Sequence, residues 1–213
     1  MLLHKLEAML HELYAIEVGY AVSDFLITDA ELARTLDSDG RKVDEKLLIA
    51  EADGEADVAL YLERELLERL THRDPLTRLD ADNIADFWAA LEGVSHFIYY
   101  AWNAVRDKSV SLFELELQAE VDKFVTTAKL LREQGDQDAD RLHAWLFDAP
   151  VLAAELGHEE RERYRRANRY AGKYCRRLEP VLARGADEAA AQRELRHFYR
   201  LSQGSKLAHI DAG

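Results

Sequence analysis

Helical periodicity over most of the chain is the feature that most constrains its fold. From about residue 63 onward, apolar residues recur at three- and four-residue spacing, which places them on one side of an α-helix. Residues that break helices interrupt this pattern at Pro75, at 107–109, at 135–138, around Pro150 and at 180–185. The sequence therefore predicts a helical subregion over 64–204, with no strand of comparable strength inside it.

Two long helices are expected to lie side by side in the middle of the chain. The segment 82–106 carries one continuous apolar stripe, and the segment 111–133 begins with Ser111 and Glu114 at the spacing of a capping box. Their short connection favours an antiparallel pair. In such a pair Glu120, which interrupts the apolar stripe of the second helix, comes level with the middle of the first.

A change to alternating periodicity predicts strands before residue 63. Apolar residues alternate with small or polar ones over 14–22, and two β-rich runs flank Asp53 and Gly54, a dipeptide typical of a two-residue hairpin turn. Between these strands, 28–31 has the form of a capping box that opens a brief helix. We expect a three-stranded antiparallel sheet within 14–63.

The predicted fold class is α+β, with a small three-stranded antiparallel sheet near the amino terminus followed by a predominantly helical assembly. The 213 residues suffice for one good-sized core, so 1–213 is expected to form one compact domain with 14–63 as its β-rich subregion. Cys175 is the single cysteine, which excludes an internal disulfide and favours the cytoplasm. Neither a signal peptide nor an apolar run long enough to span a membrane is expected.

Charge is distributed unevenly along this acidic chain, whose net charge is −13. Residues 1–160 carry 15 basic and 35 acidic side chains, a balance of −20, whereas 161–213 carry 13 and 6, a balance of +7. An acidic protein is repelled from nucleic acid and anionic lipid at long range, yet a basic face can bind them at short range. The same face could instead dock on the acidic body of the protein.

The basic surplus is concentrated on one side of a helix over 161–180. Six cations share this face: Arg165, Arg166, Arg169, Lys173, Arg176 and Arg177. Such density suits contacts with a phosphate-bearing ligand, with nucleic acid as one example, or with an acidic partner protein. A solvated face with no ligand, or one that pairs with the rest of the chain, explains the same pattern.

Four acidic or imidazole side chains are candidates for acid-base or metal chemistry. Glu120 lies in an apolar stripe, where a bare charge must find a partner or stay protonated, and His96 could carry a proton; both are candidate catalytic residues. Glu92 lies one helical turn before His96 and could bind a divalent metal with it, together with Glu116 or Glu120. A structural role for each of these side chains is the competing interpretation.

Two Glu-x-x-His pairs, Glu155 with His158 and Glu194 with His197, have the spacing found in ferritin-like di-metal bundles. Chance alone gives about one such pair in a chain of this composition, and strands near the amino terminus are foreign to that bundle. The pairs are therefore a weak indication of a metal centre.

The leading functional expectation is a non-enzymatic cytoplasmic binding or regulatory module that recognises an acidic or phosphate-bearing partner through its basic carboxy-terminal helices. The first alternative is an enzyme with a carboxylate and histidine site around Glu92, His96, Glu116 and Glu120. The second is a structural protein that forms oligomers, which would expose a large apolar patch. The sequence identifies no cofactor and no substrate.

Overall fold

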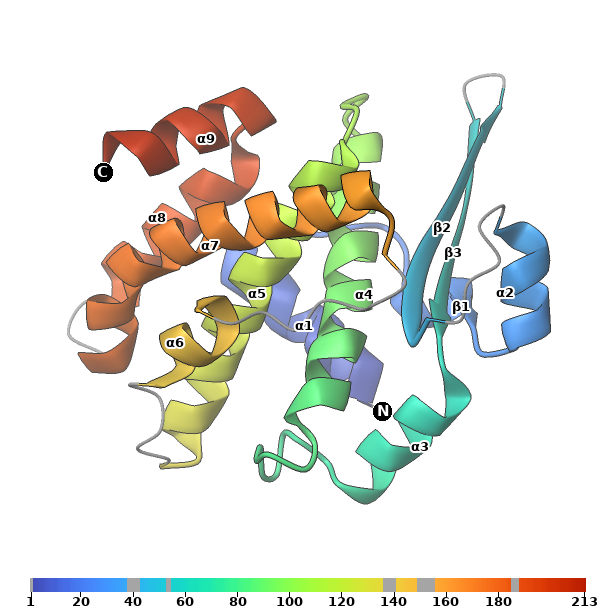
Figure 1. Ribbon diagram of the computed structural model, residues 1–213, viewed down its shortest axis with the longest axis horizontal. Helices are drawn as coiled ribbons and strands as arrows, with labels where there is room; N and C mark the ends of the chain where they lie inside the picture. Colours follow the sequence, from blue (N-terminus) through green and yellow to red (C-terminus); the bar gives the residue numbers. More distant parts are fainter. Residues whose placement is uncertain (1, 38–42, 53–54, 136–140, 149–155, 185–187) are drawn as a thin grey trace.

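The computed structural model describes residues 2–37, 43–52, 55–135, 141–148, 156–184 and 188–213 (Figure 1). Its elements follow in chain order: α1 (Leu2–Tyr14), the 3₁₀ turn η1 (Val22–Phe25), β1 (Leu26–Ile27), α2 (Ala30–Leu36), β2 (Glu45–Ala52), β3 (Glu55–Leu62), α3 (Arg64–His72), α4 (Ile84–Ala104), α5 (Leu112–Glu133), α6 (Leu142–Phe147), α7 (His158–Arg184), α8 (Glu188–Arg200) and α9 (Gln203–Ala212). The chain is α+β with a helical majority, which confirms the predicted class.

Helix α4 runs through the middle of the molecule. The hairpin of β2 and β3 lies along one side of it, and α1, α3 and α5 pack around the rest (Figure 1). Every residue from Gly93 to Asn103 is buried, including those on the face that carries His96. A helix enclosed on all sides must satisfy its polar side chains within the protein.

The sheet has three strands in the order β1, β3, β2. β2 and β3 are antiparallel, but β1 pairs parallel to β3 through Leu26 and Ile27, so the predicted all-antiparallel sheet is corrected to a mixed one. Side chains alternate between the two faces of the hairpin. Leu60 and Leu62 point toward α4, whereas Tyr61 packs with residues of α2 on the other face.

The strand predicted over 14–22 is wrong. Tyr14 ends α1, and the chain continues as an extended segment without a ladder partner to η1. Ile16, Val18 and Val22 are nevertheless buried while Glu17 is exposed. Alternation therefore predicted the buried side correctly at these residues but not at Tyr20, which is 51% exposed at a bend. It also cannot reveal whether another strand lies within hydrogen-bonding distance.

The predicted hairpin is present. Ala52 of β2 pairs with Glu55 of β3, and Asp53 and Gly54, the residues predicted to form the turn, lie outside the described residues.

Asp29 caps α2 by accepting hydrogen bonds from the backbone N–H of Glu31 and Leu32, one residue later than the predicted capping box.

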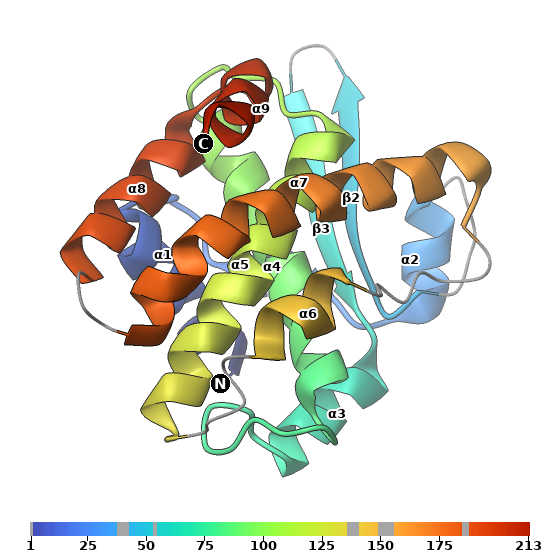
Figure 2. The same ribbon diagram turned by 60° about the vertical axis from the view of Figure 1, so that its left-hand side comes forward.

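The helical half follows the prediction more closely. Ser111 and Glu114 form the expected capping box at the start of α5. Helix α7 crosses α5 (Figure 2) and extends through Pro180 to Arg184, although a break was expected at this proline. Leu178 and Leu182 pack against the core on both sides of it, which favours continuation of the helix.

No helix in the described segments is both long and apolar enough to cross a membrane.

Gly93 allows α4 to approach the hairpin closely. A Cβ atom at this position would lie 2.9 Å from Leu60 Cδ1, 3.0 Å from Glu45 Oε2 and 3.2 Å from Leu62 Cδ2. Leu60 and Leu62 are fully buried and have little room to move aside. A Cβ atom at Gly204, which is also helical, would have no neighbouring atom within 4 Å in the described structure.

We expect Gly93→Ala to destabilise the protein although alanine favours helices by about 1 kcal/mol over glycine. Overpacking of a dense core costs about 1 to 3 kcal/mol, so the net loss should reach up to about 2 kcal/mol. The matched variant Gly204→Ala should gain up to about 1 kcal/mol. Urea unfolding of both variants measures the difference, and equal stabilities would mean that α4 and the hairpin are not in close contact.

Candidate functional site

Glu92 and His96 face the hairpin from one side of α4, where Glu45 at the start of β2 meets them. Glu45 Oε1 lies 3.8 Å from His96 Nδ1, and the ligand atoms of Glu45, Glu92 and His96 lie within 4.8 Å of one another. Glu45 was missed by the sequence analysis. Its signal was its alternation with Leu47 and Ile49, which places a carboxylate on the inward face of a strand.

Glu116 of α5 completes this group from the other side of the imidazole. Its Oε2 lies 3.8 Å from His96 Nε2, and its Oε1 lies 3.8 Å from Arg163 Nε of α7. We call the four residues Glu45, Glu92, His96 and Glu116 the carboxylate–histidine centre. The structure thus brings together three of the four predicted candidates, drawn from two neighbouring helices.

Glu120, the fourth candidate, lies beside the centre and is held by other groups. Its carboxylate accepts hydrogen bonds from Lys123 Nζ at 2.9 Å and from Asn168 Nδ2 at 3.3 Å. Lys123 Nζ also forms an ion pair with Glu92, so one ammonium group links the two carboxylates. Glu120 therefore has a cation and an amide donor, the arrangement expected for a structural carboxylate.

The centre retains polar atoms that its own side chains do not satisfy. Glu45 Oε2 and His96 Nε2 are buried, and neither has a hydrogen-bond partner among the described residues. The nearest carboxylate to His96 Nε2 is too distant for a hydrogen bond at 3.8 Å. Buried polar atoms in native proteins are almost always bonded, so two unpartnered atoms in one cluster indicate a group that is able to accept further ligands.

Burial controls the ionisation of the centre. It raises the pKa of Glu45 and of Glu116 well above the usual range, with the neighbouring Glu92 charge acting in the same direction. Burial also opposes ionisation of Glu92, but Lys123 outweighs it and keeps the pKa of Glu92 below its ordinary value. Burial lowers the pKa of His96 to about 4, which leaves the imidazole neutral and able to donate a lone pair to a metal.

A second polar cluster lies where α1, α4, α5 and α9 meet, and the sequence analysis did not anticipate it. Asp122 accepts hydrogen bonds from Tyr14, Ser95 and Gln118, and Gln118 Oε1 accepts one from Lys206 Nζ at 2.7 Å. We call these five residues the Asp122 network. All of them are buried, but each has a partner, so the network supplies a fixed connection between helices and offers no open ligand position.

The basic face of α7 is largely occupied by contacts within the protein. Lys173 pairs with Asp211 of α9 at 2.9 Å, and Arg165 pairs with Glu162 at 2.9 Å. The remaining cations of this face contact the following groups: the rings of Phe113 and Tyr170 for Arg166, the ring of Tyr170 for Arg169, His143 Nδ1 for Arg176, and the His209 carbonyl for Arg177. Four of the six cations thus contact other helices, whereas Arg165 and Arg169 contact residues of α7 itself.

Cys175 and the two Glu-x-x-His pairs do not form a site for nucleophilic or metal chemistry in the described residues. Cys175 is buried, and burial raises the pKa of its thiol, which opposes thiolate chemistry. Glu194 Oε1 lies 2.6 Å from His209 Nε2. Glu194 therefore contacts a histidine other than His197, the second residue of its Glu-x-x-His pair. Glu155, of the other pair, lies outside the described residues.

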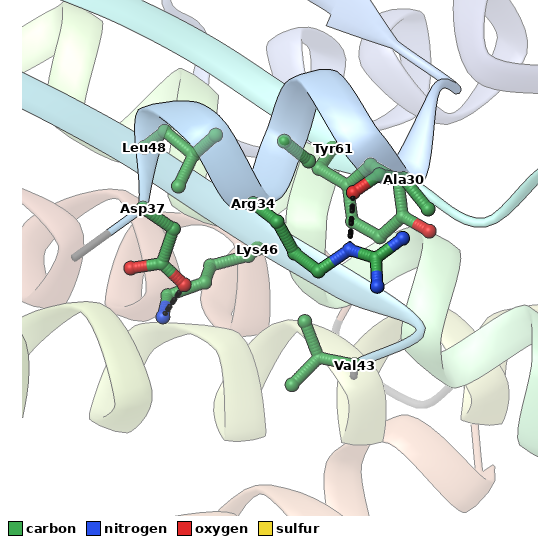
Figure 3. Close-up of a pocket in the computed structure, with 8 residues that line it drawn as sticks. Ala30, Arg34, Asp37, Val43, Lys46, Leu48 and Tyr61 are labelled. Atoms are coloured by element: carbon green, nitrogen blue, oxygen red, sulfur yellow. Dashed lines mark hydrogen bonds and ion pairs between the residues drawn. The ribbon is translucent and has the colours of Figure 1, made fainter. Parts of the chain in front are cut away.

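A small pocket between α2 and the sheet also has little capacity for chemistry. It has a volume of about 130 Å³, and apolar side chains such as Val43 and Leu48 form much of its wall (Figure 3). Lys46 pairs with Asp37 at 2.6 Å, and Arg34 donates to the Ala30 carbonyl. Its charged groups thus already have partners.

We expect Lys206→Met to stabilise the protein at acidic and neutral pH. Burial, opposed by Asp122 and Glu114, lowers the pKa of Lys206 from 10.5 to about 7 in the folded protein. The unfolded chain therefore holds a proton between pH 7 and 10.5 that the folded protein lacks, and the buried amine destabilises the fold as pH falls through this window. The variant should gain about 1 to 3 kcal/mol at pH 6, after its lost hydrogen bond to Gln118 is included.

Urea unfolding at pH 6 and pH 9.5 measures this gain, which should shrink at the higher pH. The exposed Lys173→Met provides the control, and its stability should change little at either pH. Destabilisation of Lys206→Met at both pH values would show instead that the ammonium is charged and is stabilised by Asp122.

No family model matches this chain, and no curated protein or solved structure resembles it significantly. The functional argument therefore rests on the side chains of the carboxylate–histidine centre.

Proposed function

We propose that this protein binds a divalent transition-metal ion at Glu45, Glu92 and His96 and uses it in catalysis. The observation that carries the proposal is the Glu45 carboxylate, whose buried Oε2 has no hydrogen-bond partner among the described residues, beside Nδ1 of a neutral His96 and within 4.8 Å of the Glu92 carboxylate. A cation bound by the Glu45 carboxylate would compensate for its burial, which the surrounding protein does only in part.

The spacing of the donor atoms supports this assignment. Metal–ligand distances of about 2.0 to 2.2 Å place neighbouring ligands of a tetrahedral ion about 3.4 Å apart. The atoms of Glu45 and His96 are separated by 3.8 Å, and the full set lies within 4.8 Å. Side-chain adjustments of about 1 Å therefore suffice to close the site around an ion.

The donor set favours particular metals. One imidazole with two carboxylates suits Zn²⁺, Mn²⁺ or Fe²⁺ better than Ca²⁺ or Mg²⁺, which prefer oxygen ligands alone. Three protein ligands also leave coordination positions for water or substrate, which is the property that distinguishes catalytic from structural zinc sites. The ion would supply Lewis-acid chemistry.

Glu116 has a different role in this proposal. Because it faces Nε2 whereas Glu45 faces Nδ1, Glu116 can accept the Nε2 proton of a His96 ring that binds the metal through Nδ1. A carboxylate in this position fixes the tautomer and orientation of the ligand. Glu116 is therefore assigned as a positioning residue, held in turn by Arg163.

We prefer this function to partner recognition by α7 because the two surfaces differ in how far they are satisfied. The cations of the α7 face have carboxylate, carbonyl, imidazole or aromatic neighbours. The carboxylate–histidine centre is half-buried at Glu45 and Glu92 and buried at His96, and two of its buried atoms have no hydrogen-bond partner in the part of the chain that the structure describes. Buried polar atoms without hydrogen-bond partners indicate a ligand more strongly than exposed charged side chains do.

We expect the metal-free protein to gain about 2.7 kcal/mol of stability when Zn²⁺, Mn²⁺ or Fe²⁺ is present at 100 times its dissociation constant. For a chain of this size, that gain raises the melting temperature by roughly 5 to 10 °C. Thermal unfolding after removal of metal with a chelator measures the shift for each ion separately. Titration calorimetry should give a stoichiometry of about one ion per chain.

Two variants test the ligand assignment. Glu45→Gln keeps the size and hydrogen-bonding capacity of a protonated glutamate, so it should fold normally without metal and lose most of the metal-induced shift. His96→Gln should behave in the same way. Glu120→Gln is the matched control, because Glu120 shares Lys123 with the centre but is not a ligand, and it should retain the shift. Equal shifts in Glu45→Gln and the unmodified protein would exclude this site.

A further inference from the structure

A groove near the end of α4 has features that neither the carboxylate–histidine centre nor the α7 face explains. We call it the Trp102 groove. It has a volume of about 880 Å³ and lies between the end of α1 with the segment that follows it, the end of α4, and the end of α8. Its charged and aromatic lining consists of His11, Glu12, Glu17, Trp102, Arg106, Lys108 and Arg200.

Three cations surround the indole of Trp102. The guanidinium carbon of Arg106 lies 4.3 Å from the ring centroid, and Lys108 Nζ and the guanidinium carbon of Arg200 each lie 5.8 Å from it. Within the described residues, none of the three forms an ion pair with a carboxylate. Three neighbouring cations in an acidic protein therefore converge on one aromatic ring.

The backbone of the same groove is strained. Ala15 and Asp107 have φ values of 48° and 54°, and they are the two residues other than glycine with positive φ among those described. Ala15 lines the groove, and Asp107 lies between Arg106 and Lys108 in the chain. Arg200 donates to the carbonyls of Tyr14 and Ala15, which holds the first of these turns in place. Both residues follow the end of a helix, where a left-handed residue commonly ends the helix and turns the chain.

We propose that the Trp102 groove binds the phosphate group of a small molecule. Arg106 and Lys108 are exposed and can turn their donors toward an anion, and His11 Nε2 is a buried, unpartnered nitrogen in the same lining. Trp102 itself is only 4% exposed, so it positions the cations and cannot stack on a base. The site therefore recognises the phosphate.

The acidic part of the lining limits the size of the ligand. Glu12 and Glu17 are exposed on the α1 side of the groove, opposite in charge to the cations. A nucleic acid or an anionic membrane would place further phosphates against these carboxylates, whereas a single phosphate can contact the cations alone. This balance of charges favours a small phosphorylated molecule.

The proposal is independent of metal binding. Trp102 lies six residues after His96, a distance of about 9 Å along the helix, and no residue of the carboxylate–histidine centre lines the groove. Experiments in the presence of a chelator therefore separate the two proposals.

Titration calorimetry with inorganic phosphate and with glycerol 3-phosphate, in a chelator and at low ionic strength, tests the site directly. Both probes should bind, and binding should shift the indole N–H resonance of Trp102 in NMR spectra. Affinity should fall as salt is added, because the recognised groups are charged and exposed.

Substitutions in the groove test whether phosphate binds at Lys108 and Arg106. Lys108→Gln removes a cation with no hydrogen bond in the described structure and should raise the dissociation constant at least threefold. Adding Arg106→Gln should raise it at least tenfold. The matched control is Arg165→Gln with Arg169→Gln on α7, which should leave the affinity within twofold.

Three results would overturn the proposal. The first is the absence of both heat and a Trp102 shift at millimolar phosphate. The second is an equal loss of affinity in the α7 control variant, which would place the site on that face. The third is binding of oligonucleotides or anionic vesicles without binding of either small phosphate, which would assign the groove to a macromolecular partner.

Discussion

Burial of α4 on all sides is the constraint on which the rest of the structure depends. The hairpin covers one side, and α1, α3 and α5 cover the others. Gly93 permits this close approach because a Cβ there would meet Leu60 and Leu62. Once the helix is enclosed, its polar residues lose water as a hydrogen-bond partner. The neighbouring elements must then supply partners for Ser95 and His96.

The protein meets this demand differently at two positions along α4. Ser95 donates to Asp122, which also binds Tyr14 and Gln118, so this network is satisfied by the chain itself. One residue later, His96 meets three carboxylates, and Nε2 remains without a hydrogen-bond partner. The contrast shows that polar burial alone does not indicate function. The carboxylate–histidine centre has its proposed role in metal binding because it retains open positions, whereas the Asp122 network does not.

The uneven charge of the sequence also has a structural outcome. The basic helix α7 packs along α5, and several of its cations contact groups of α5, α6 and α9. The contacts with α5 and α6 are made to an aromatic ring and an imidazole, so α7 is held to the rest of the chain by more than opposite charge. A separate group of cations lies at the ends of α4 and α8, where only folding brings Arg106 and Arg200 together around Trp102.

The sequence by itself determined the helical character of the chain after residue 63, the cap of α5 and the paired strands of the hairpin, because helix periodicity, capping and turn residues depend on interactions within a few residues. It did not determine that α7 continues through Pro180. It also indicated Glu92 and His96 as one unit, since one helical turn separates them. Tertiary structure alone decided that β1 pairs parallel to β3, that Glu45 joins His96, and that Glu120 instead binds Lys123 and Asn168. These outcomes depend on contacts between residues far apart in the chain, and the partner of a side chain cannot be deduced from the spacing of its neighbours.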